Sequence, residues 1–184
     1  MPDTPQEPCL YIITGSRGAG KTNFCQELAK AARRAGLDVA GILSIAVFEG
    51  VYRTQIVAED LRTGASHILA TRRDPDEPPQ PLATRNWQFD PQGIVWGNHV
   101  LAASLPAGVL IVDELGTLEF EREQGWLAGL QALDSQQYSL ALVVIRPELL
   151  ANALQRWPDA YIVEIDTPED SQDKARQLSK RLFS

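Results

Sequence analysis

A glycine-rich segment near the amino terminus has the pattern G-x-x-x-x-G-K-[ST], which is typical of a loop that holds the phosphates of a nucleotide. Its residues are Gly15, Ser16, Arg17, Gly18, Ala19, Gly20, Lys21 and Thr22. Glycines let the backbone curl so that successive N–H groups point into one concavity, and the positive end of a following helix adds to the attraction for phosphate. In such a loop Lys21 bridges the β- and γ-phosphates, and Thr22 offers a hydroxyl to Mg²⁺. The segment predicts binding of a nucleoside triphosphate.

Two carboxylates, Asp113 and Glu114, follow four consecutive apolar residues at positions 109–112. An acid at the end of a core strand in a nucleotide-binding sheet lies beside Mg²⁺. Because strand side chains alternate between faces, the two acids should point in different directions. We expect Asp113 to hold the metal with its water shell, and Glu114 to face the γ-phosphate and activate water. The pair therefore favours hydrolysis.

Arginines are the candidates for stabilising the charge that develops during phosphate transfer. Arg146 follows the apolar stretch 140–145, which we expect to neighbour the strand of Asp113. It is interpreted either as a group that reaches the γ-phosphate or as a solvated arginine before Pro147. Arg17 inside the loop and Arg53 are further candidates for reaching the same charge.

Alternating apolar strands and amphipathic helices are expected to position these residues. The sequence predicts strands over 10–14, 109–112, 140–145 and 161–165, and helices over 21–35, 94–103, about 122–133, from Pro147, and over 168–182. This order predicts an α/β fold with a mostly parallel sheet covered by helices on both faces. Ligands bind such sheets at the carboxyl ends of the strands, so the site residues should lie just after strands.

A β-meander interrupts this alternation. Strands are expected over 39–46, 51–60, 66–69 and, as a short piece, 86–89. Four prolines between positions 74 and 81 predict a surface loop at 74–81. Trp87, Phe89 and Trp96 are the aromatic residues beside that loop. They could stack on a base, but we favour their interpretation as core residues. The run from Glu119 to Glu123 is interpreted as a solvated helix start.

Composition limits the classes of partner. The 184 residues, 44% of them apolar, fit one domain over 1–184, with residues 1–8 as a frayed arm and not a signal peptide. A net charge of −7 argues against nucleic acid, and no stretch approaches the roughly 18 apolar residues of a membrane span. We expect a cytoplasmic protein with Cys9 and Cys25 reduced, and no zinc site.

The segment from Asp113 to Glu119, D-E-L-G-T-L-E, looks like the hallmark of a known family when it is taken together with the loop from Gly15 to Thr22. The chain resembles the small P-loop nucleoside-triphosphatases first described from thermophiles, which are related to the cancer-related nucleoside-triphosphatase of animals. The turns at 50–53 and 60–64 are also similar. The resemblance implies a three-layer P-loop NTPase fold of the RecA-like additional-strand type, Mg²⁺ as cofactor, and slow hydrolysis of ATP, GTP or other nucleoside triphosphates. The chain departs from the family at 45–48 and 166–170, as a divergent member dedicated to a partner enzyme would.

Two alternatives remain open. One is a small-molecule or nucleotide kinase, with Arg72, Arg73 and the proline-rich loop as a lid. The other is a nucleotide-dependent switch that acts on a protein partner or in a homo-oligomer. A guanine-specific switch is disfavoured because the chain has no N-K-x-D or T-K-x-D segment.

Overall fold

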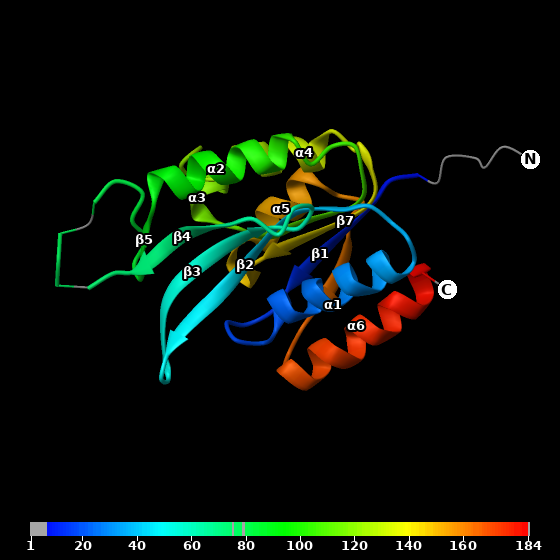
Figure 1. Cartoon of the computed structure of the whole chain (residues 1–184), viewed down its shortest axis with the longest axis horizontal. Helices are drawn as coiled ribbons and strands as arrows, with labels where there is room; N and C mark the ends of the chain where they lie inside the picture. The colour runs from blue at the N-terminus through cyan, green and yellow to red at the C-terminus, as the bar shows by residue number, and fades with distance from the viewer. Residues whose placement is uncertain (1–6, 75, 79, 184) are drawn as a thin grey trace, which may run out of the picture.

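The computed structural model describes residues 7–74, 76–78 and 80–183. Its strands are β1 (Cys9–Thr14), β2 (Val39–Glu49), β3 (Tyr52–Asp60), β4 (Ser66–Arg72), β5 (Trp87–Phe89), β6 (Ala107–Leu115), β7 (Tyr138–Ile145) and β8 (Tyr161–Glu164). They form one sheet in the order β5-β4-β3-β2-β6-β7-β1-β8, with helices on both sides (Figure 1). The predicted α/β class is confirmed.

The parallel half of the sheet consists of β2, β6, β7, β1 and β8. Its central strands are apolar along most of their length because helices cover both of their faces. β7 lies between β1 and β6, so one strand separates the strand that precedes the glycine-rich loop from the strand that ends near Asp113. Since these three strands are parallel, their carboxyl ends meet at one edge of the sheet.

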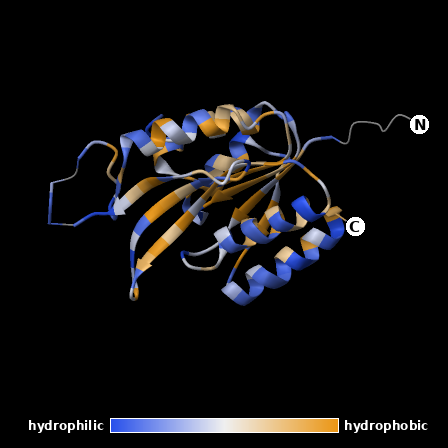
Figure 2. Ribbon diagram, viewed as in Figure 1, coloured by the Kyte–Doolittle hydropathy of each residue, from blue (hydrophilic) through white to orange (hydrophobic). Residues whose placement is uncertain are grey.

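The antiparallel half is the predicted meander, β2-β3-β4-β5. β2 joins the two halves: residues 39–42 pair in parallel with β6, and residues 42–49 pair in antiparallel with β3. The β2–β3 hairpin projects beyond the body of the molecule (Figure 1). Figure 2 shows that the long strands of this hairpin carry hydrophobic residues along much of their length.

The helices form two layers. On one face lie α1 (Lys21–Arg34) and α6 (Pro168–Phe183), which pack on each other. On the other face lie α2 (Pro91–Ala102), α3 (Thr117–Phe120), α4 (Leu127–Asp134), the 3₁₀ turn η1 (Pro147–Leu149) and α5 (Leu150–Arg156). Each layer buries its own apolar cluster against the sheet, with Phe24 and Leu178 in one cluster and Leu101 and Leu133 in the other.

The helix predicted over about 122–133 is wrong at its start. α4 begins at Leu127, and a loop with positive φ at Glu123 and Gly125 separates it from α3. The loop is held by Glu119, whose carboxylate accepts the N–H groups of Gly116 and Trp126, each at 2.7 Å. Glu119 is therefore buried, and its interpretation as part of a solvated run is wrong.

α2 begins at Pro91 and not at Ile94, because the Asp90 carboxylate caps it by accepting the N–H groups of Gln92 and Gly93.

The expected loop at 74–81 is neither helix nor strand at its described residues, while Pro75 and Pro79 lie outside them. Most of the expected arm at 1–8 also lies outside the described residues, which begin at Glu7. In the part of the chain that the structure describes, no helix has the length and apolar character needed to cross a bilayer.

Candidate active site

The glycine-rich loop connects β1 to α1 and is held from behind by the carboxyl-terminal part of the chain. Gly15 has φ +138°, and a Cβ there would lie 2.0 Å from the backbone oxygen of Ile165, so no other residue fits. Ile165 N–H donates to Thr14 O at 2.8 Å, and Ser171 Oγ donates to Gly20 O at 2.8 Å. The region after β8 and the start of α6 thus fix the shape of the loop.

Lys21 lies folded over this loop. Its ammonium donates to the backbone oxygens of Gly15 and Ser16, each at 2.7 Å. Burial lowers the pKa of Lys21, while the carboxylate of Glu114 acts in the opposite direction. The cation is therefore held at the mouth of the loop, close to the carboxylates that end β6.

Asp113 is 1% exposed and is fastened to β2. Its Oδ2 accepts the Ser44 N–H at 2.9 Å, and Ser44 Oγ donates to the backbone oxygen of Asp113 at 2.7 Å. Burial raises the pKa of Asp113 to about 7, and hydrogen bonds from Ser44 and Thr22 oppose that rise. A cation placed beside this carboxyl would offset the cost of burying its charge.

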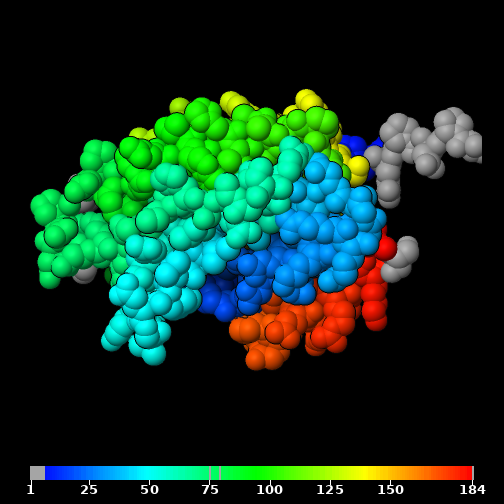
Figure 3. Space-filling model, in the orientation of Figure 1, coloured from blue at the N-terminus to red at the C-terminus, as the bar shows by residue number. Residues whose placement is uncertain are grey.

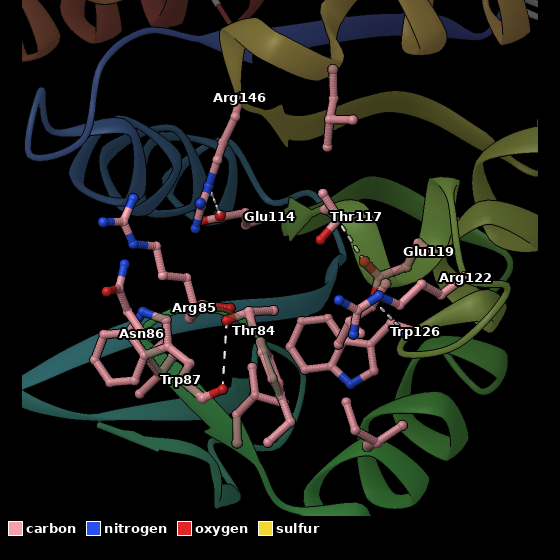
Figure 4. Close-up of a pocket in the computed structure, with 18 of the residues that line it drawn as sticks. Thr84, Arg85, Asn86, Trp87, Glu114, Thr117, Glu119, Arg122, Trp126 and Arg146 are labelled. Atoms are coloured by element: carbon pink, nitrogen blue, oxygen red, sulfur yellow. Dashed lines mark hydrogen bonds and ion pairs between the residues drawn. The ribbon is translucent and has the colours of Figure 1, made fainter. Parts of the chain in front are cut away.

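Glu114 points away from Asp113, as predicted, but alternation along a regular strand is only part of the reason. The β6–β7 register shifts between Val112 and Leu115, and Glu114 has φ +79°. This irregularity turns the Glu114 side chain outward, where its Oε1 accepts a hydrogen bond from Arg146 Nε (Figure 4). The two side chains are about one third exposed, at 32% and 38%.

The protein groups suited to a metal are few. Among the described residues no three His, Cys, Asp or Glu side chains gather in a way that could hold an ion by themselves. The Thr22 hydroxyl and the Asp113 carboxyl lie side by side instead, and together they offer two oxygen donors. Mg²⁺ prefers one or two such donors together with phosphate oxygens and water, so this pair fits Mg²⁺ that arrives with a triphosphate.

One cavity of about 840 Å³ collects the predicted site residues. It is lined by Gly15, Ser16, Arg17, Gly18, Gly20, Lys21, Thr22, Asp113, Glu114 and Arg146, while Ala19 packs into the core. The space-filling view shows a recess between the projecting β2–β3 hairpin and the start of α6 (Figure 3). Arg53 and Arg72 line it from the meander. Local patterns as far apart in the sequence as Gly15 and Arg146 are thus brought to one place.

Ser44 and Glu148 are among the residues lining this cavity that sequence reasoning missed. A serine in a strand carries no chemical pattern of its own, and only the pairing of β2 with β6 places Ser44 beside Asp113. Trp87 is 4% exposed and lies under the Arg53 guanidinium, 5.1 Å from its ring centre, while Trp96 stacks on His67. Trp87 is thus a core residue that also forms part of the cavity wall.

The fold and the cavity define an α/β nucleotide-binding protein with a phosphate-binding loop. The sequence model of a family described as NTPase matches residues 10–176. The chain therefore belongs to this NTPase family, a family of nucleoside-triphosphate hydrolases, and the resemblance found in its motifs is confirmed.

Relatives of the chain carry the name nucleoside-triphosphatase THEP1. The protein from Ignicoccus hospitalis is 28% identical over 169 residues, which cover 91% of this chain and 94% of the relative. The protein from Thermococcus kodakarensis is 27% identical over 133 residues, 72% of this chain and 74% of the relative.

Two solved structures share the fold. A human cancer-related nucleoside triphosphatase superposes with a TM-score of 0.69 at 18% identity, with 95% of this chain and 97% of that chain covered. THEP1 from Aquifex aeolicus superposes with a TM-score of 0.65 at 20% identity, with 95% and 99% covered. These similarities show the P-loop fold.

Proposed function

We propose that the protein hydrolyses the γ-phosphate of a Mg²⁺-bound nucleoside triphosphate, either ATP, GTP or another. The observation that carries this proposal is the convergence of Lys21, Thr22, Asp113 and Glu114 on one cavity. The backbone N–H groups of the loop and the ammonium of Lys21 bind the phosphates. Lys21 then exchanges the carbonyl oxygens of Gly15 and Ser16 for phosphate oxygens.

Thr22 and Asp113 would hold Mg²⁺, which supplies positive charge against the β- and γ-phosphates. Their own geometry supports this role, because the second oxygen of the Asp113 carboxyl is not used by Ser44, which donates to Oδ2. Ser44 fixes the orientation of the carboxyl from the β2 side, so that little rearrangement is needed when the cation arrives.

Glu114 is the proposed general base. A water molecule attacks the γ-phosphorus, the bond from that phosphorus to the β–γ bridging oxygen breaks, and Glu114 takes the proton of the water. The products are the nucleoside diphosphate and inorganic phosphate. Arg146 orients the Glu114 carboxylate through its Nε and lies where it can stabilise charge on the γ-phosphate.

The experiment that tests this proposal is a phosphate-release assay with each nucleoside triphosphate, in Mg²⁺ and in excess chelator. We expect slow release that requires Mg²⁺ and that falls to background in chelator. Full turnover in excess chelator would contradict the roles of Thr22 and Asp113. Adding candidate hydroxyl acceptors to the same reactions and following the labelled γ-phosphate separates hydrolysis from transfer to a small molecule.

A further inference from the structure

A second cavity of about 310 Å³ lies behind the Glu114–Arg146 pair. It shares walls with the nucleotide cavity at Arg53, Glu114 and Arg146, and continues toward α2 and α3. In Figure 4 the pair lies on one side of this inner cavity, while Trp87 and Trp126 lie toward the other. The two cavities therefore adjoin at the end of the nucleotide site that the proposed function assigns to the γ-phosphate.

Hydrolysis by itself does not require the inner cavity. One water molecule occupies about 30 Å³ in the liquid, whereas the space behind Glu114 is about ten times larger and falls in the size range of small-molecule sites. Its floor is apolar, with Ile56, Leu69, Ile94 and Trp126 all buried. Water bound against such a floor leaves its apolar surface hydrated. An apolar ligand removes that surface from water, which favours binding.

The charged lining of the inner cavity is mostly cationic. Five arginines line the cavity, Arg17, Arg53, Arg85, Arg122 and Arg146, against three glutamates, Glu114, Glu119 and Glu148. Two of the glutamates are already engaged, Glu114 by Arg146 and Glu119 by two backbone N–H groups. In a chain of net charge −7 this is a local surplus of positive charge, which attracts anions.

Three donors of residues that line this cavity lack partners. The Arg53 Nε, the Trp87 Nε1 and the Trp126 Nε1 are buried with no hydrogen-bond acceptor among the described residues. A buried donor without an acceptor destabilises the fold, so a ligand that offers an acceptor to one of these atoms is bound more favourably. Arg122 uses Nη1 to donate to the Ala83 carbonyl at 3.0 Å, and its guanidinium has further N–H groups for a ligand.

We propose that the inner cavity binds a small organic anion with a planar apolar body, such as an aromatic carboxylate, beside the γ-phosphate end of the nucleotide. The apolar body lies on the floor between the Trp87 and Trp126 indoles, where aromatic faces favour a flat ring. The anionic group faces the arginines. The position beside the γ-phosphate rests on the proposed function, whereas the site itself rests only on the geometry of the cavity.

The test uses benzoate as the probe, titrated calorimetrically into the full chain. We expect saturable binding at one site, with neutral benzamide at least about 10-fold weaker because it lacks the charge. The indole N–H resonance of Trp87 should shift in a nuclear magnetic resonance titration. The resonance of Trp157, whose Nε1 donates to Asp134 outside the cavity, should not shift.

Two variants locate the anion. Arg122→Gln and Arg85→Gln change arginines that line the inner cavity but not the nucleotide cavity, and each should weaken benzoate by about 10-fold. Arg34→Gln, at the exposed end of α1, is the matched control and should leave the affinity unchanged. Thermal melting of each variant shows whether the fold is retained, and Arg85→Gln keeps the test valid if Arg122→Gln disturbs the Ala83 contact.

Lys21→Ala separates this proposal from the proposed function. Benzoate binding should survive this substitution, even though triphosphate affinity falls. Three results would overturn the inner site: no saturation by benzoate, affinity unaffected by both inner-cavity variants, or loss of benzoate binding in Lys21→Ala together with full competition by inorganic phosphate. The last result would place the anion on the glycine-rich loop.

Discussion

Glu114→Gln is the substitution that most directly tests the proposed chemistry. The amide keeps the size of the side chain, and its oxygen still accepts the Arg146 N–H, but it cannot take a proton from water. Loss of a general base costs about 10²–10⁴-fold in rate, which corresponds to roughly 3–5 kcal/mol in the activation barrier. We therefore expect phosphate release to fall by about 10²-fold or more.

Binding and stability should respond differently from the rate. The Glu114 and Arg146 side chains are 32% and 38% exposed, so their ion pair is screened by solvent and contributes at most about 1 kcal/mol to folding. The melting temperature should therefore change by no more than about 4 °C. Affinity for the triphosphate should persist or rise, because the substitution removes a negative charge near the γ-phosphate and leaves Arg146 cationic.

The assay pairs phosphate release with a fluorescence titration of a triphosphate analogue, at saturating Mg²⁺. Glu49→Gln, at the exposed end of β2, is the control for loss of one carboxylate and should behave as the unmodified chain does. Parallel loss of binding and turnover would show that Glu114 supports the structure or the metal. An unchanged rate would refute the assignment of Glu114 as base.

Four further substitutions test the loop and the metal side. Lys21→Ala should reduce triphosphate affinity by about 10-fold or more in the same titration, with little change in melting temperature, because its ammonium donates, among the described residues, to backbone oxygens of the loop alone. Asp113→Asn should abolish Mg²⁺-dependent turnover. In chelator it should raise the melting temperature by about 2–4 °C, because the amide oxygen still accepts the Ser44 N–H and no charge is buried. A lower melting temperature would contradict this account. Gly15→Ala should destabilise the protein by about 3 kcal/mol or more in urea denaturation, because its Cβ would meet the Ile165 oxygen, whereas Gly18→Ala, at φ +81° in open space, should cost only about 1–2 kcal/mol. Equal costs at the two glycines would show that the close approach to Ile165 is not what requires Gly15.

The sequence alone was sufficient to predict those features of this protein that depend on short stretches of chain. The loop from Gly15 to Thr22 is recognisable because its backbone shape requires glycine at fixed spacing between a strand and a helix. The acids after 109–112 are recognisable because a fully buried strand reads as an uninterrupted apolar run. The alternation of such strands with helices predicted the parallel half of the sheet, and the turn residues predicted the meander.

The tertiary structure decided everything that depends on which strands become neighbours. The contact of Ser44 with Asp113 joins residues 69 positions apart, and the pair of Arg146 with Glu114 joins residues 32 positions apart. Glu119 looked like a solvated acid, but two backbone N–H groups made its burial possible, and the helix predicted from about residue 122 begins only at Leu127. The inner cavity exists only because α2, α3 and the meander leave space behind Glu114. Local propensity cannot encode such contacts, because their free energy comes from groups that meet only after the strand order is set.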